Sequence, residues 1–100
     1  MESQSVFFHP KAIAEASAPA RWYQERSFVA AKAFISELDR IIEKIIETPG
    51  IYPCYIGDTR RALFHRFPFS VVYCIVSERI EVIAITHGRR RPGYWKERLA

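Results

Sequence analysis

Between residues 28 and 47, apolar residues recur at three- and four-residue spacing, a stricter pattern than elsewhere in the chain. This spacing predicts an amphipathic helix of about five turns, with Ser27 as its N-cap and residues 48–50 (TPG) as its end. The apolar face is expected to bury Ala31, Phe34, Ile35, Leu38, Ile41, Ile42, Ile45 and Ile46. The polar face is expected to hold Glu37, Asp39, Arg40, Glu43, Lys44 and Glu47. Because one face of such a helix must be covered, we expect a layered fold.

A second helix is expected before this one, over residues 11–25. Pro10 suits its first turn, where the missing N–H has no partner to lose. Pro19 removes a backbone hydrogen bond inside the helix, so we expect a bend or a break near residues 17–19. The residues expected to be buried are Ala12, Ile13, Ala16, Trp22 and Tyr23.

Runs of β-branched and aromatic residues predict four strands. They cover residues 5–9, 60–67, 69–76 and 80–86. The near-continuous apolar run over residues 69–76 predicts a strand buried on both faces, and residues 77–79 predict a short turn after it. The first strand has no hairpin partner, so we expect it at the sheet edge, paired with the C-terminal half. The order β-α-α-β-β-β predicts an α+β fold, with two N-terminal helices packed on a mostly antiparallel four-stranded sheet. The tail over residues 94–99 is expected to form one or two helical turns.

Length and composition set the class of protein. One hundred residues suffice for one domain, expected to span residues 1–100, and 49% apolar with 26% charged residues is typical of a globular chain. No apolar run is long enough for a membrane span and no secretory signal is visible, so we expect a cytoplasmic protein without a membrane partner. Cys54 and Cys74 are expected to be reduced. They stand in no ligand-like spacing with histidine, so no metal or other cofactor is expected.

Charge is divided unevenly along the chain, whose net charge is +4. Residues 1–50 hold six Lys/Arg and seven Asp/Glu, which gives −1, and residues 51–100 hold nine and four, which gives +5. Eleven of the fifteen basic residues are arginine, which suits bidentate contacts to phosphate or carboxylate. The basic half therefore indicates an anionic partner, either nucleic acid or an acidic protein segment.

Four local patterns carry a resemblance to a known family. They are residues 8–12 (FHPKA), 22–26 (WYQER), 66–73 (RFPFSVVY) and 87–98 (HGRRRPGYWKER). In this order the chain resembles the RelE/ParE toxins of type II toxin–antitoxin systems, in their ParE-like, plasmid-stabilisation branch. The resemblance implies the fold predicted above. It also implies neutralisation by a cognate antitoxin, whose acidic amphipathic C-terminal segment wraps the toxin.

The family includes two activities, and the residues favour one of them. Its ribonucleases cut mRNA on the ribosome, and Arg90 and Tyr94 would correspond to the tail Arg and Tyr of that branch. His87 could supply a base, and Arg66 is a further weak catalytic candidate, although it could instead pair with Glu37 or Asp39.

Against this, Ser70 stands where the ribonuclease branch carries a catalytic arginine, and residues 60–66 contain no lysine. The residues therefore favour a ParE-like toxin that acts by binding, without enzymatic activity, and the resemblance implies that its target is DNA gyrase. A RelE-like, ribosome-dependent mRNA endoribonuclease is the alternative. A small basic RNA-binding domain without toxicity is a second alternative.

The candidate binding residues are the basic and aromatic side chains of the second half. Those expected to contact the target or the antitoxin are Arg60, Arg61, Arg89, Arg90, Arg91, Tyr94, Trp95, Lys96 and Arg98. The expected partners are the antitoxin together with DNA gyrase or, alternatively, the ribosome and mRNA. Other interpretations remain open at this point. The arginine run can be an ordinary solvated surface, Tyr94 and Trp95 can pack on the sheet, and His87 can bond to backbone.

Overall fold

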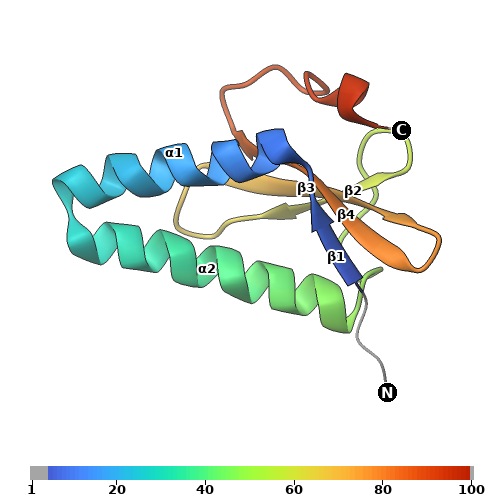
Figure 1. Ribbon diagram of the computed structural model, residues 1–100, viewed down its shortest axis with the longest axis horizontal. Coiled ribbons are helices and arrows are strands. Elements are labelled where there is room, and N and C mark those ends of the chain that lie inside the picture. Colours follow the sequence, from blue (N-terminus) through green and yellow to red (C-terminus); the bar gives the residue numbers. More distant parts are fainter. Residues whose placement is uncertain (1–4, 100) are drawn as a thin grey trace.

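The computed structural model describes residues 5–99, which form two helices and a four-stranded sheet (Figure 1). The elements are β1 (Ser5–Phe8), α1 (Pro10–Arg26), α2 (Phe28–Glu47), β2 (Thr59–Leu63), β3 (Phe69–Val76), β4 (Arg79–His87) and a 3-10 turn, η1 (Lys96–Arg98). The strand order is β1-β4-β3-β2, with β1 parallel to β4 and the other pairs antiparallel. The predicted α+β fold is confirmed, and β1 lies at an edge as expected.

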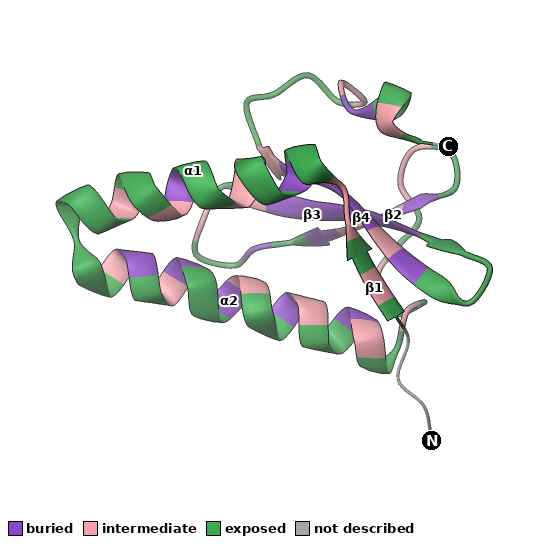
Figure 2. Ribbon diagram, in the orientation of Figure 1, coloured by how far each residue is buried: buried purple, intermediate pink, exposed green. Residues whose placement is uncertain are grey.

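Helix α2 supplies the centre of the core. The Ser27 hydroxyl caps the helix by accepting the Ala30 N–H at 3.1 Å, as predicted. Phe34 is fully buried, and its ring stacks on that of Phe64 with centroids 5.2 Å apart. The rings of Phe67 and Phe69 meet it edge-on. The purple inner sides and green outer sides of both helices in Figure 2 show that each buries one face. Ile35 was expected in the core but is exposed, because it lies at the margin of that face.

Helix α1 is continuous through Pro19, so of the two predicted alternatives, a bend or a break, the break is wrong. Pro19 is buried, and packing of α1 against α2 and β4 offsets its missing backbone hydrogen bond. The buried or half-buried stripe consists of Ala12, Ala16, Pro19, Ala20 and Tyr23. Ile13 and Trp22 were expected in the core but are 53% and 51% exposed, because neither position falls on that stripe.

The sheet is buried on both faces, as the apolar run of β3 predicted. Val71 and Tyr73 face the helices, whereas Val72 and Cys74 belong to a second apolar cluster around Trp95. Strand β4 contains a β-bulge, because Val72 pairs with Ala84 and Tyr73 pairs with Val82, leaving Ile83 as an extra residue. Ile83 and Ala84 consequently both join the second cluster.

Glu37 departs from the expected polar face of α2, since it is only 4% exposed. Its carboxylate accepts the backbone N–H of His65, and that of Arg66 at 3.4 Å. The expected contact between Arg66 and Glu37 is therefore made by the backbone of Arg66 and not by its guanidinium. This turn also explains why β2 ends at Leu63 and not at Phe67, where the sequence suggested.

Replacing Phe34 tests the centre of the core. Because Phe34 is fully buried among aromatic rings, Phe34→Ala should lower the free energy of unfolding by about 3–5 kcal/mol. Urea unfolding followed by circular dichroism measures the loss. Val29→Ala on the same helix is the control, since Val29 is 76% exposed and its loss should stay within about 0.5 kcal/mol. Equal losses in the two variants would contradict this description of the core.

Candidate functional site

The C-terminal tail is held against the body of the protein by one acidic side chain. The Glu15 carboxylate accepts the Tyr94 hydroxyl at 2.7 Å and both terminal nitrogens of Arg98 at 2.9 Å. It also accepts the backbone N–H of Ile85 at 3.1 Å, while Arg98 donates to the Ile83 carbonyl at 3.0 Å. We call Glu15, Tyr94 and Arg98 the clasp. The clasp thereby pairs the backbone N–H of Ile85 and the backbone carbonyl of Ile83 at the edge of β4. These groups lie beyond the end of β1, where no neighbouring strand is available to pair with them.

The clasp changes the proton affinities of its members. Burial alone would raise the pKa of Glu15, but hydrogen bonds from Arg98 and Tyr94, with the Arg98 charge, lower it below its ordinary value of 4.5. Burial, together with the neighbouring Glu15 carboxylate, raises the pKa of Tyr94. The hydrogen bonds to Glu15 raise the pKa of Arg98 further above its already high value. Glu15 and Arg98 are therefore charged, and Tyr94 is neutral, at pH 7.

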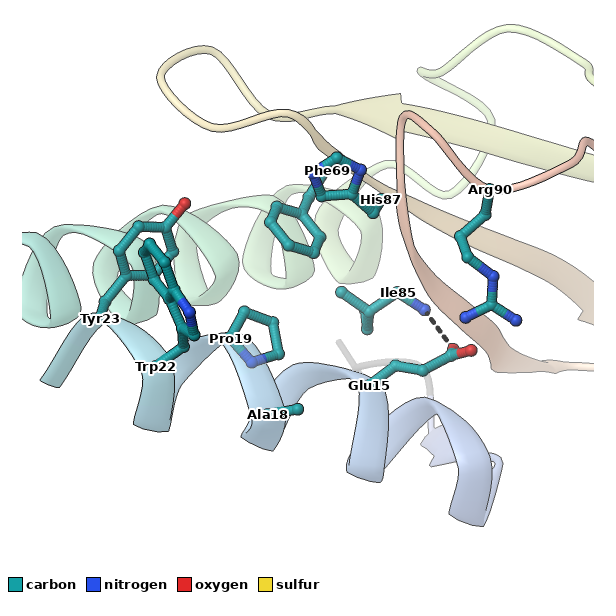
Figure 3. Close-up of a pocket in the computed structure, with 9 residues that line it drawn as sticks. All are labelled: Glu15, Ala18, Pro19, Trp22, Tyr23, Phe69, Ile85, His87 and Arg90. Atoms are coloured by element: carbon teal, nitrogen blue, oxygen red, sulfur yellow. Dashed lines mark hydrogen bonds between the residues drawn. The ribbon is translucent and has the colours of Figure 1, made fainter. Parts of the chain in front are cut away.

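An open cleft of about 430 Å³ lies between α1 and the ends of β3 and β4. Its lining residues are Glu15, Ala18, Pro19, Trp22, Tyr23, Phe69, Ile85, His87 and Arg90 (Figure 3). We call it the α1 cleft. The His87 ring meets Phe69 edge-on at 5.0 Å, and its Nδ1 accepts the Arg89 N–H at 3.0 Å. The Arg90 guanidinium lies 3.8 Å from the centroid of the Tyr94 ring.

Several candidate binding residues are used inside the fold. Trp95 is 1% exposed, so it packs on the sheet and cannot meet a partner directly in this conformation. Arg98 is committed to the clasp. Arg60 donates to the carbonyls of Tyr52 at 2.5 Å and Gly50 at 3.2 Å. Each of these three side chains thus makes its contacts within the fold, and a role for them in partner binding stays a prediction.

The other candidates have side chains at the surface. Arg89, Arg90, Arg91 and Lys96 are exposed, and within residues 5–99 none of them lies within 4.0 Å of a carboxylate. The Arg61 guanidinium lies over the Tyr55 ring, 4.1 Å from its centroid, and Arg61 is half-buried. The tail thus presents several uncommitted cations.

The nuclease candidates are only partly brought together. His87 and Arg90 line the α1 cleft, and Tyr94 lies beneath Arg90. Arg66 belongs to the turn between β2 and β3 and does not line the cleft. Ser70 is buried in β3. Glu15 was not among the residues predicted from the sequence. A glutamate on a helix is normally exposed, and nothing in the nearby sequence indicates that it pairs with Arg98 at the other end of the chain.

Neither a metal-binding cluster nor a membrane-spanning helix is present in the described part of the chain. Residues 5–99 contain no group of three His, Cys, Asp or Glu side chains placed to bind a metal ion. In the same part of the chain, no helix combines the length and apolar character that crossing a membrane requires. Cys54 and Cys74 are both free thiols.

Comparison with solved structures identifies the class of fold. The chain is similar to one from a structure titled "Chromosomal ParDE TA system from P. aeruginosa", with a TM-score of 0.62 and 18% identity. The match covers 84% of this chain and 95% of that one, and at this identity it shows a shared fold. The fold is therefore one that occurs in a toxin–antitoxin system.

The family follows from the sequence. The model of the ParE toxin of type II toxin–antitoxin systems, parDE, matches residues 6–92, and the chain belongs to this family. No curated protein matches the chain significantly. The resemblance drawn from the four local patterns is thus confirmed, and a small RNA-binding domain without toxicity is set aside.

The clasp predicts how stability depends on pH. A carboxyl group with a pKa that is lower in the folded state stabilises the fold above its unfolded pKa, and this stability is lost as the pH falls through the folded pKa. Glu15→Gln should therefore be less stable than the wild type at pH 7, with a difference that shrinks as the pH falls below about 4.5. Urea unfolding at a series of pH values measures this. Glu25→Gln, at a surface pair, is the control and should change little. A difference independent of pH would count against the clasp.

Proposed function

We propose that this ParE-family toxin inhibits DNA gyrase by binding and that a cognate antitoxin neutralises it. The observation that carries the proposal is the run Arg89-Arg90-Arg91, exposed and without a carboxylate partner among residues 5–99. Exposed guanidinium groups attract an anionic partner and favour bidentate contacts with carboxylate or phosphate. Glu15 of the clasp binds Ile85, which precedes this run, and Tyr94, which follows it, so little order has to be acquired on binding. The proposed place of action is the cytoplasm, where gyrase and its DNA are found.

The antitoxin is the second proposed partner. The similar solved structure is named as a ParDE toxin–antitoxin system, and this supports a paired antitoxin for the present chain. An acidic amphipathic segment would complement both the exposed arginines and the apolar walls of the α1 cleft.

An mRNA endoribonuclease is the alternative, and one observation favours it. His87, Arg90 and Tyr94 lie close together around the α1 cleft, where an imidazole and a guanidinium could act on a phosphodiester. Two observations weigh against it. The Tyr94 hydroxyl is held by Glu15 with a raised pKa, and the buried Ser70 replaces a phosphate-binding cation with a neutral group.

A supercoiling assay separates the two activities. The purified chain should inhibit supercoiling of relaxed plasmid by gyrase, whereas mRNA in a translating extract should remain intact. The variant Arg89→Gln/Arg90→Gln/Arg91→Gln should inhibit about tenfold less, because three exposed charges are removed. Arg21→Gln/Arg26→Gln/Arg40→Gln, with the same charge removed from the helices, is the control. Cleavage of mRNA with unimpaired gyrase would overturn the proposal in favour of the endoribonuclease.

The same arginine variant tests the antitoxin contact. With the proposed cognate antitoxin, we expect about tenfold weaker binding for the variant, and a shallower dependence of log Kd on log salt concentration. Isothermal titration at several salt concentrations gives both quantities. Unchanged affinity and slope would remove the tail arginines from the antitoxin interface while leaving the gyrase assay as an independent test.

A further inference from the structure

The α1 cleft combines an apolar interior with one uncommitted cation at its rim. Its walls include Pro19 and Trp22 from α1, Phe69 from β3 and Ile85 from β4. Figure 3 shows the Arg90 side chain extending from the tail toward the cleft, on the side opposite Trp22. An apolar hollow beside a guanidinium matches a ligand that carries an apolar group next to a carboxylate.

The acidic group in the cleft does not repel such a ligand. The charge of Glu15 is matched by Arg98, which contacts both of its oxygens at 2.9 Å, and the Tyr94 hydroxyl donates to one of them. The ion pair is also largely shielded from water, with side-chain exposures of 9% for Arg98 and 15% for Glu15. Arg90 is therefore the charge that an incoming anion would meet first.

Glu15 is linked to Arg90 through the ring of Tyr94. The Arg90 guanidinium stacks on the Tyr94 ring at 3.8 Å, and the hydroxyl of that ring is fixed by Glu15 at 2.7 Å. Arg98 contacts the same ring at 5.3 Å. A free arginine side chain loses rotamer entropy when it is fixed, so a guanidinium that is already stacked binds an anion at lower cost. A residue of α1 thus positions a cation of the tail.

We propose that the α1 cleft is the docking site for an acidic protein segment, with an apolar side chain of that segment in the cleft and the adjacent carboxylate on Arg90. Glu15 is the positioning residue that holds Arg90, through Tyr94, over the cleft. The inference rests on the proposed function for the existence of an acidic protein partner. Charge complementarity supports this occupant, because Arg90 lines the cleft and, like its neighbours Arg89 and Arg91, has no carboxylate within 4.0 Å among residues 5–99. A strand of RNA fits less well, because it carries a phosphate on every nucleotide, whereas Arg90 is the only Arg or Lys among the residues that line the cleft.

The two tryptophans provide a built-in test. Trp22 lines the cleft and Trp95 is buried in the second cluster, so the ¹H–¹⁵N spectrum has one reporting indole and one internal control. The probe is a blocked tripeptide with phenylalanine between two glutamates. Titration should shift the Trp22 indole signal to saturation and leave that of Trp95 unchanged. Matched peptides with glutamine in place of glutamate, or alanine in place of phenylalanine, should bind at least about fivefold more weakly.

Variants separate docking from positioning. Arg90→Gln removes the cation, and Ala18→Phe fills the cleft, so each should abolish the saturable Trp22 shift. Arg21→Gln makes the same change of charge at a residue of α1 that does not line the cleft, and it should leave the shift unchanged. Glu15→Gln raises the net charge of the protein from +4 to +5. On charge alone, this change would strengthen binding of an acidic peptide. We expect it to weaken binding about fivefold because Arg90 is no longer held. Tyr94→Phe keeps the Glu15–Arg98 pair and should weaken binding in the same direction. If Glu15→Gln also moves the Trp95 signal of the free protein, that variant has disturbed the fold. Tyr94→Phe is then the variant that tests whether Glu15 positions Arg90 through Tyr94.

Three results would overturn the inference. Absence of a saturable Trp22 shift in the wild type would remove the docking site. Unchanged affinity in Tyr94→Phe and Glu15→Gln would remove the positioning role of Glu15. A tetra-adenylate that shifts the Trp22 signal as strongly as the peptide would replace the protein segment by RNA. Each result is separable from the proposed function, because a chain that inhibits gyrase without a Trp22 shift keeps that function and loses only this site.

Discussion

Strand β4 extends beyond the strand that pairs with its outer edge, and the rest of the structure depends on how that edge is closed. β1 ends at Phe8, so the backbone groups of Ile83 and Ile85 on β4 have no neighbouring strand. A carboxylate from α1 accepts the N–H of Ile85, and a guanidinium from the tail donates to the carbonyl of Ile83. Since Glu15 and Arg98 also bind each other, this one set of contacts joins the first helix, the last strand and the tail.

The clasp is favourable only as a complete set. Shielding two charges from water costs several kcal/mol per ion, and a pair recovers this only with good geometry and further hydrogen bonds. Here the Glu15 carboxylate has four donors, and Arg98 has a backbone carbonyl in addition. The β-bulge adds an apolar contribution, because it turns Ile83 and Ala84 toward Trp95. The polar contacts of Arg98 and the apolar contacts of Trp95 therefore both hold the C-terminal tail against β4.

Fixing the tail decides which basic residues remain for a partner. Arg98 and Arg60 complete hydrogen bonds inside the protein, whereas the run from Arg89 to Arg91 stays exposed beside the α1 cleft. A toxin of the ParE family that acts by binding needs such a surface, with cations for attraction and an apolar hollow for affinity. The walls of the cleft come from α1 and from the C-terminal half of the chain, so the binding surface exists only once these segments have packed together.

The sequence by itself determined the layered α+β fold, because helix periodicity, capping by Ser27 and apolar strand runs are local patterns that survive without knowledge of the partners. The family resemblance was likewise carried by short local motifs. Only the tertiary structure decided that Glu15 meets Arg98, that Glu37 turns inward to bind a loop, and that Trp95 is buried. The physical reason is that each of these outcomes depends on contacts between segments far apart in the chain. The one-residue bulge in β4 places Ile83, whose carbonyl accepts Arg98 and whose side chain joins the cluster of Trp95, and neither composition nor periodicity encodes that bulge.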